Sequence, residues 1–452
     1  MRLSKSQLIA YGLPGLPLAL LGLPLVIYLP PVYAEHFGIG LGAVGGALLI
    51  ARLWDLISDP LLGHLSDRLP YRRKRLILIL AGTPMLLLAA DALFRPSNPP
   101  DALYLLLWSL VLYTGWTAVV MSYSAWGAEI SKDYRERSHI TAVREVFVLL
   151  GTLSAVLLPA LFGLAEAQAL GLLGGFFIIS YLLSLPGLWH LPPMNDATGG
   201  SVMTLSRGIR LLRENRPLRQ LLLAYLLNGI ANGIPAALFL LFVEHVLGRP
   251  EQAWLYLAVY FCAGVAGFSV FLPLARRFGK HRAWALSMLF ACLVFAWVPL
   301  APLTEPGYFI LICLLTGLSL GVDMSLPSSI QADVIDLDRS QGGGERAGLF
   351  FGLWGMATKL ALALAIGISF PLIELAGFDP AVDGSNTWVL LLTYGLLPLP
   401  FKLLAAGWMW NFPLDQSAVQ ALQRRNHVQD PHRTGHSPDP DPDTRRMLDH
   451  EA

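Results

Sequence analysis

The chain has 452 residues, of which 55% are hydrophobic and 14% charged, with a mean hydropathy of +0.56 and a formal net charge of +1. Soluble domains carry about 25% charged residues, so the composition excludes an ordinary soluble domain. The near-zero net charge also gives no reason to expect nucleic acid as a partner, and we predict a protein embedded in a lipid bilayer.

Twelve apolar segments of about spanning length follow one another along the chain. They cover roughly residues 8–34, 40–65, 76–95, 102–128, 140–164, 168–192, 218–247, 251–275, 282–302, 306–333, 346–374 and 387–411. The pattern predicts an all-α polytopic membrane protein of two six-helix halves. The halves are residues 1–192 and 218–412, joined by a cytoplasmic loop at 193–217 and followed by a mostly disordered cytoplasmic tail at 413–452.

The basic residues indicate the orientation of these segments. Of 32 Lys and Arg residues, 26 lie on one side, four lie inside the segments, and only Arg95 and Arg249 lie on the other side. By the positive-inside rule, both termini are expected in the cytoplasm.

Asp55 and Asp59 lie one helical turn apart in the middle of the second segment, and Arg52 lies three residues before Asp55. A charged side chain at this depth costs about 2.5–3.5 kcal/mol on insertion scales. Two carboxylates on one helix face cannot both ionise cheaply unless a cation lies between them. We therefore predict a site for a coupling cation, Na⁺ or a proton. The alternative is a permanent ion-pair network with Arg52 and Lys359 that only fixes helix packing.

Several sequences resemble a known family. Residues 63–68 (GHLSDR) and 72–75 (RRKR) resemble the cytoplasmic loop signature of the major facilitator superfamily. Residues 52–60 (RLWDLISDP) resemble helix II of the glycoside-pentoside-hexuronide:cation symporters, the melibiose permease group. Further matches are residues 125–129, 133–137, 332–336 and 351–354. The resemblance implies the major facilitator fold and cation-coupled uptake of a small solute, with a sugar or glycoside as the expected class.

The resemblance also implies roles for single residues. In the family, the helix II acids bind Na⁺, Li⁺ or a proton, which places Asp55 and Asp59 in that role, assisted by Thr117. The helix XI lysine lies near the acids, which implies that Lys359 couples cation binding to transport together with Arg52. No cofactor and no resident metal are expected beyond the coupling cation.

Three family positions differ here. Sugar-transporting members carry acids where this chain has Ala19 and Val120, and an aromatic residue where it has Ser124. The same family includes lysophospholipid transporters, and the apolar first segment would suit an amphiphile. A lysophospholipid is therefore the alternative substrate.

Other polar and aromatic side chains within the apolar segments are candidates to contact the solute. They are Arg144, Asn228, Asn232, Asp323, Ser124, Tyr123 and Trp354. The alternative for Arg144 is pairing with an acid across the halves, and for Asp323 a charge near a helix break or the membrane interface. For the others it is helix packing, interhelical hydrogen bonding or the interfacial aromatic belt.

Charged residues at the expected cytoplasmic helix ends are candidates for a gate. They are Asp67, Arg68, Glu129, Arg137, Asp333 and Asp336. Repacking of such ion pairs lets two halves rock between states. The alternative is that they are solvated loop charges.

No Walker loop, zinc-type histidine pair or nucleophile elbow is present in the sequence, so we expect no enzyme. The prediction is a monomeric secondary active transporter in a bacterial inner membrane. A membrane sensor or scaffold that has lost transport is the alternative from another class.

Overall fold

The computed structural model describes residues 3–68, 74–97, 99–130, 134–164, 166–191, 205–303, 305–341, 347–382 and 385–414. Almost all of these residues are helical. The predicted tail lies almost entirely outside the described residues. Eleven segments in the described part are long and apolar enough to cross a membrane. With α11 (Ala253–Phe278), a largely apolar helix of 26 residues, they make the predicted twelve.

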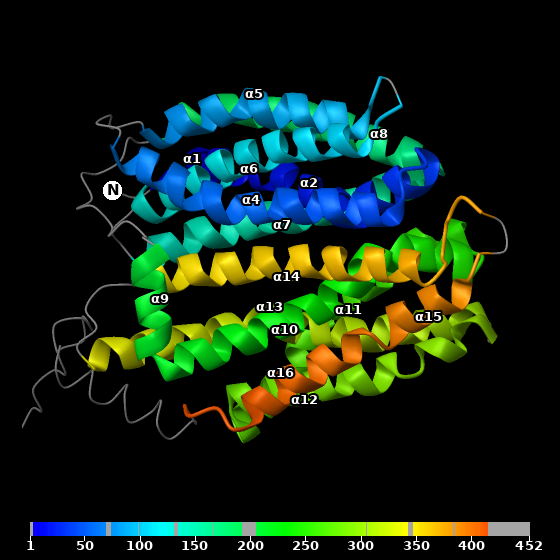
Figure 1. Cartoon of the computed structure of the whole chain (residues 1–452). Helices are drawn as coiled ribbons and strands as arrows, with labels where there is room; N and C mark the ends of the chain where they lie inside the picture. Colours follow the sequence, from blue (N-terminus) through cyan, green and yellow to red (C-terminus); the bar gives the residue numbers. More distant parts are fainter. Residues whose placement is uncertain are drawn as a thin grey trace, which may run out of the picture.

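The helices of the N-terminal half run side by side as long rods (Figure 1). The first rod is interrupted where prolines remove backbone donors, at Pro14 and again near Pro30 and Pro31. Its pieces are α1 (Lys5–Gly12), α2 (Gly15–Ile27), α3 (Leu29–Pro31) and the π-helical turn η1 (Val32–His36). The other rods are α4 (Leu41–Arg68), α5 (Lys74–Phe94), α6 (Ala102–Ile130), α7 (Tyr134–Phe162) and α8 (Glu166–Leu188).

The C-terminal half repeats this plan. Its elements are α10 (Arg216–Leu241) with η2 (Phe242–Val246), η3 (Pro250–Gln252), α11, α12 (Lys280–Phe295) with η4 (Val298–Leu303), α13 (Pro306–Ser340), α14 (Ala347–Leu375), α15 (Thr387–Gly395) and α16 (Pro398–Trp410). The segment 193–217, expected as a loop, contains a helix that the sequence analysis did not predict, α9 (Leu205–Glu214). The helix forms because it is amphipathic: Leu211 is buried in a hydrophobic cluster of the C-terminal half, whereas Arg210 is exposed.

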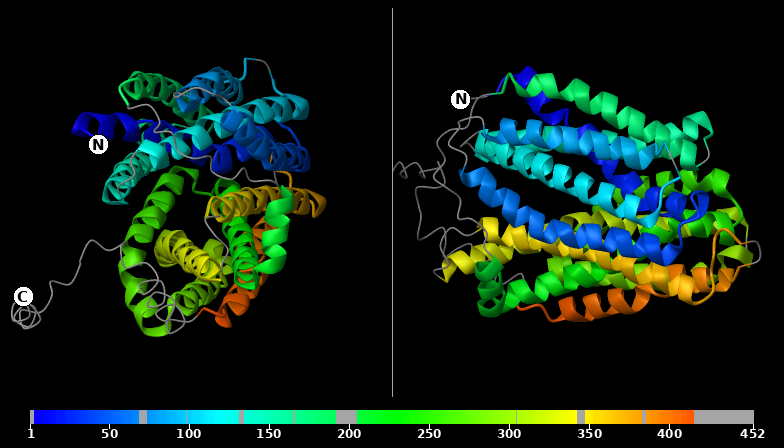
Figure 2. Two further views of the ribbon diagram at one scale, coloured as in Figure 1. Left: turned by 90° about the vertical axis from the view of Figure 1, so that its left-hand side faces the viewer. Right: turned by 45° about the horizontal axis from the view of Figure 1, so that its top comes forward.

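The two ends of the bundle differ in charge. We call the basic end the one where α1 begins, α4 ends, and Arg276, Arg277 and Lys280 join α11 to α12. We call the acidic end the opposite one, where α8 begins and where η1 and η2 lie. Viewed along the helices, the two halves form two separate groups (Figure 2).

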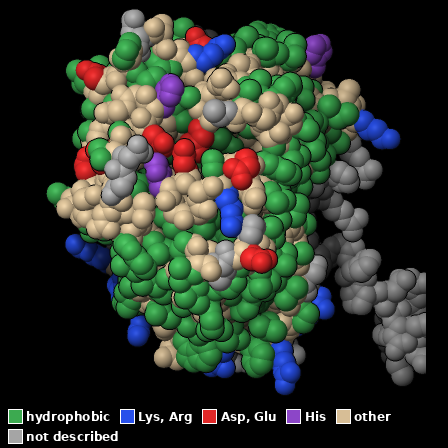
Figure 3. Space-filling model, turned by 90° about the vertical axis from the view of Figure 1, so that its right-hand side faces the viewer, with side chains coloured by type: hydrophobic (Ala, Val, Ile, Leu, Met, Phe, Trp, Pro, Cys, Tyr) green, Lys and Arg blue, Asp and Glu red, His purple; other side chains and the backbone are tan. Residues whose placement is uncertain are grey.

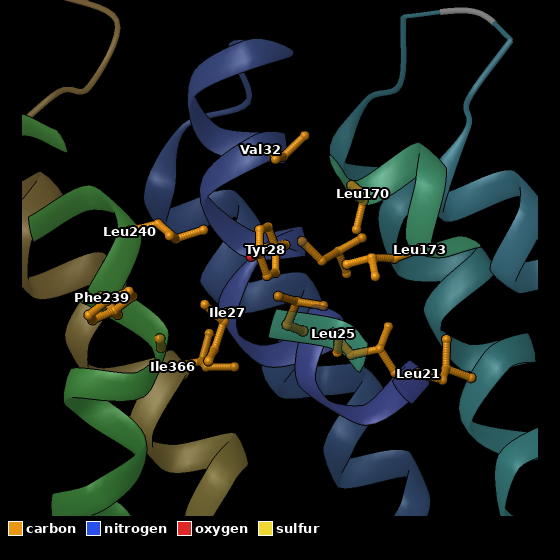
Figure 4. Packing of buried hydrophobic residues seen from close by; sticks show 14 of the residues in the cluster. Leu21, Leu25, Ile27, Tyr28, Val32, Leu170, Leu173, Phe239, Leu240 and Ile366 are labelled. Atoms are coloured by element: carbon orange, nitrogen blue, oxygen red, sulfur yellow. The ribbon is translucent and has the colours of Figure 1, made fainter. Parts of the chain in front are cut away.

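Among the described residues, the halves share a hydrophobic core toward the acidic end. There, Ile27 and Tyr28 of the first half lie in one cluster with Phe239, Leu240 and Ile366 of the second (Figure 4). Toward the basic end, the described core of the C-terminal half is a separate cluster without residues of the N-terminal half. This structure is therefore closed between its halves at the acidic end.

Helices α4 and α14 make the most extensive contact between the halves in the described part of the chain. A Cβ atom on Gly45 would lie 2.9 Å from Cβ of Phe370, and one on Gly367 would lie 2.7 Å from Leu49. Nearer the acidic end, the Gly42 amide donates to Glu374 at 2.8 Å. The crossing holds the middle of α14 beside the acidic stretch of α4.

Candidate cation site between the two halves

Three side chains of the N-terminal half form an oxygen-rich group. Asp55 and Asp59 point from α4 toward Thr117 of α6. The Thr117 hydroxyl lies 2.9 Å from Oδ1 of Asp59 and 3.2 Å from Oδ1 of Asp55, with one hydrogen to share between them. Asp55 is fully buried and the Asp59 side chain is 18% exposed. Carboxylate and hydroxyl oxygens are the ligands that hard cations prefer.

Lys359 enters this group from the opposite half. Its ammonium donates to both oxygens of Asp59, at 2.7 and 2.8 Å, and to Thr117 at 3.3 Å. It lies 3.4 Å from Oδ2 of Asp55. A single Lys side chain therefore contacts both acids across the interface between α4 and α14 and compensates one of their two charges.

Arg52 supplies the second positive charge. Its guanidinium is 4.0 Å from Oδ2 of Asp55 and 4.2 Å from the centre of the Tyr113 ring. Oδ2 of Asp55 is buried and has no hydrogen-bond partner among the described residues. Two carboxylates thus face two positively charged side chains. Oδ2 of Asp55 nevertheless keeps an unused lone pair with which it could bind a cation.

A second buried charge pair lies wholly inside the C-terminal half. Asp323 of α13 accepts hydrogen bonds from Trp284 at 2.7 Å and from Asn232 at 3.0 Å. Lys402 of α16 donates to Asn232 and lies 3.5 Å from Asp323. Asn232, Asp323 and Lys402 border a mainly apolar cavity of about 120 Å³. Asn232 and Asp323, both predicted to contact solute, therefore lie together in the structure. Their partner Lys402 was not predicted to have a role.

The remaining predicted solute contacts are scattered. Tyr123 is buried, stacks on Tyr11 with ring centres 4.8 Å apart, and donates to the Tyr11 carbonyl at 2.6 Å. This places it in the packing of the N-terminal half. The ring of Trp354 stacks on that of Tyr225, with ring centres 3.8 Å apart.

Three further candidates have no common site. Arg144 pairs with its neighbour Glu145 at 2.6 Å. Ser124 is exposed, and the buried Asn228 has an Oδ1 atom without a hydrogen bond in the described part of the chain.

The predicted gate is described only in part. Asp333 pairs with Lys280 at 2.6 Å, and both belong to the C-terminal half. This ion pair therefore fastens α12 to α13 and does not join the halves. Asp336 lies one turn further along α13. The side chains of Asp67, Arg68, Glu129 and Arg137 lie outside the described residues.

A further group at the acidic end, formed by Glu35, Glu244 and His245, was not predicted from the sequence. The one signal for it is a repeated Glu-His dipeptide, at residues 35–36 and 244–245, near the end of the first rod of each half.

Comparison with known proteins identifies the family. A family model described as "MFS/sugar transport protein" matches residues 10–416. The inner membrane symporter YicJ of Escherichia coli is 24% identical, over 89% of this chain and 90% of its own. The human sodium-dependent lysophosphatidylcholine symporter 1 is 25% identical, over 93% of this chain and 89% of its own.

A solved structure of a D-xylose-proton symporter superposes with a TM-score of 0.63 at 14% identity, covering 91% of this chain and 98% of that one. This likeness confirms the predicted fold, with two six-helix halves and twelve membrane helices. The chain belongs to the MFS/sugar transport protein family, and it is a symporter with the major facilitator fold.

Proposed function

We propose that the protein couples the movement of Na⁺ or a proton to the uptake of a small solute, and that Asp55, Asp59 and Thr117 bind the cation. The observation that carries this proposal is the bridge from Lys359 to both carboxylates, because the ammonium occupies the position that a travelling cation would take. The Lys side chain is the counter-ion when no cation is bound.

The mechanism follows from which half holds each group. The acids and Thr117 belong to the N-terminal half and Lys359 belongs to the C-terminal half. When the halves move apart at this level, Lys359 withdraws and leaves two carboxylates with only Arg52. A cation then binds to compensate the charge. Cation binding favours the arrangement in which Lys359 no longer bridges the acids. Coupling follows if the solute binds to the same arrangement, because each ligand then stabilises the state that the other needs.

We propose that the solute is a sugar or glycoside bound between the halves. The 23% identical relative named "Putative glycoside/cation symporter YagG" supports this class. A lysophospholipid is the second candidate. It is favoured by the relatives named lysophosphatidylcholine symporters and by Ala19 and Val120, which stand where sugar-transporting members carry acids.

We propose that the basic end faces the cytoplasm of a bacterial cell and that the protein resides in the inner membrane as a monomer. The distribution of Lys and Arg supports this orientation. The shared core then lies on the outer side, and the structure corresponds to a state closed to the outside.

Uptake into proteoliposomes tests the proposal. Purified protein receives an inward Na⁺ gradient or an inward proton gradient, with labelled sugars, glycosides and lysophosphatidylcholine offered separately. We expect either the Na⁺ gradient or the proton gradient to drive accumulation of one of these classes of solute. Asp55→Asn with Asp59→Asn should abolish accumulation, whereas Asp101→Asn, at an exposed helix start, should not. Full accumulation by the double variant would overturn the cation site.

A further inference from the structure

The acidic end holds a second charged group on the interface between the halves. Glu35 of η1 meets Glu244 and His245 of η2. Each side chain offers one ligand atom, and these atoms all lie within 4.8 Å of one another. Nε2 of His245 is 3.4 Å from Oε2 of Glu35. We call these three residues the acidic-end triad.

The triad lies where the two halves repeat each other. The turns η1 and η2 are both five-residue π-helical turns that end the first rod of a half. Glu35 and His245 are each the fourth residue of their turn. Two residues after each turn stands a glycine with positive φ, +68° at Gly38 and +63° at Gly248. Equivalent positions of the two halves therefore contact each other, and a ligand bound here joins both halves directly.

The surroundings of the triad favour a cation. A hollow of about 850 Å³ opens beside it and is lined by Glu35, Glu166, Glu244 and Glu251. No Lys or Arg is among its described lining residues. Figure 3 shows acidic and histidine side chains gathered near the middle of this end. Several carboxylates around one concave surface produce a negative potential that concentrates cations.

The donor set favours one type of cation. Nε2 of His245 is a buried atom that faces Oε2 of Glu35 at 3.4 Å but makes no hydrogen bond of good geometry in the described part of the chain, so the neutral ring can bind a metal beside that carboxylate. One imidazole and two carboxylates suit Zn²⁺ and similar transition metals, whereas Ca²⁺ and Mg²⁺ prefer oxygen alone. Tetrahedral Zn²⁺ with bonds of about 2.0–2.1 Å places its ligands roughly 3.3–3.4 Å apart. The ligand atoms of the triad all lie within 4.8 Å of one another, and those of His245 and Glu35 lie 3.4 Å apart, which is close to that spacing.

We propose that the acidic-end triad binds a divalent transition-metal ion such as Zn²⁺, and that the bound ion fastens the two halves together at this end. The site is separate from the cation site at Asp55 and Asp59. A metal there stabilises the arrangement closed at the acidic end and inhibits any cycle that must open it.

Metal binding by the full-length protein tests the site without any need for transport. The tail contains four of the ten histidines, and its background binding is the same in all variants. In equilibrium dialysis, wild type should bind one Zn²⁺ more than His245→Ala or Glu35→Gln. Co²⁺ should give a ligand-field absorption that both variants lose.

Two matched controls change residues that line the hollow and leave the triad intact. His36→Gln and Glu251→Gln alter lining residues outside the triad and should bind as wild type does. Equal Zn²⁺ stoichiometry in wild type and His245→Ala would overturn the site.

The effect on the halves is measured separately. Saturating Zn²⁺ should raise the melting temperature of wild type but not that of His245→Ala. It should reduce transport of wild type at least tenfold and leave His245→Ala unchanged. A bound metal that changes neither quantity would overturn the fastening role. Because binding is read without flux, failure of this inference is distinguishable from failure of the proposed transport function.

Discussion

Lys359 of the C-terminal half donates to both carboxylate oxygens of Asp59 in the N-terminal half, at 2.7 and 2.8 Å. The two side chains are 19% and 18% exposed. Breaking a largely buried ion pair is costly when one charge is left alone, because the remaining ion keeps its desolvation cost. In the proposed cycle, another cation therefore replaces the bridge when the halves separate at this level.

Removal of Lys359 should strengthen cation binding and weaken coupled transport. Lys359→Ala eliminates the competing ammonium, and we expect apparent cation affinity to rise by about tenfold, or ~1.4 kcal/mol. Cation-dependent thermal shifts measure this affinity. Lys280→Ala, which removes a Lys from an ion pair confined to one half, is the control and should leave it unchanged. Weaker cation binding by Lys359→Ala would contradict competition.

The hydroxyl of Thr117 should contribute directly to cation affinity. Thr117→Val keeps the shape of the side chain but removes the oxygen that lies 2.9 Å from Asp59 and 3.2 Å from Asp55. Hydrogen bonds to charged groups contribute about 1.5–3 kcal/mol, so we expect cation affinity to fall at least about tenfold. Thr117→Ser restores the oxygen and should recover most of the affinity. Equal affinities for the Val and Ser variants would exclude a ligand role.

The indole of Trp284 should stabilise the buried Asp323. Trp284→Phe removes the 2.7 Å hydrogen bond to Oδ1 and leaves a buried carboxylate oxygen short of a donor. We expect a loss of about 1.5–3 kcal/mol, measured as a lower melting temperature in detergent. Trp254→Phe changes a partly exposed tryptophan at 40% exposure and is the matched control. Identical melting of the two variants would argue against this stabilisation.

Two adjacent glycines on α4 should respond oppositely to alanine. A Cβ at position 45 would lie 2.9 Å from Phe370 of the other half, whereas one at position 46 meets nothing within 4 Å. Gly45→Ala should push α4 from α14, lower the melting temperature and impair closure at the acidic end. Gly46→Ala should be neutral or stabilising by about 0.5–1 kcal/mol, because alanine favours the helix. Thermal melting and uptake of the pair measure the difference, and equal behaviour would show that the crossing tolerates a wider spacing.

The sequence predicted the fold and the central acidic group because both leave strong signals. Long apolar runs identify membrane helices, and Asp55, Asp59 and Lys359 stand out as charges within them. The pairing of Asp323 with Lys402 was not predictable, since the period of each helix says nothing about which face meets which neighbour. Tyr123 was proposed to contact solute, and its contacts place it in packing, because an aromatic side chain has the same periodicity in either role.

The acidic-end triad left a weaker signal for a different reason. Charged residues are ordinary at the ends of membrane helices, so Glu35, Glu244 and His245 did not violate any expectation. Their proximity depends on how two π-helical turns from distant parts of the chain meet. Likewise α9 is a short amphipathic helix in a polar stretch, where no run of apolar residues reveals it.

The two buried Lys residues differ in how they respond to an electric field. Lys402 and Asp323 belong to the same half, so they move together and the membrane potential does no net work on the neutral pair. Lys359 and Asp59 belong to different halves, and in the proposed cycle their charges part within the bilayer. Moving one elementary charge through the full field is worth about 2.3 kcal/mol per 100 mV. In the proposed cycle, the separation of Lys359 from Asp59 therefore contributes to the voltage dependence of transport, whereas the pair of Lys402 with Asp323 does not.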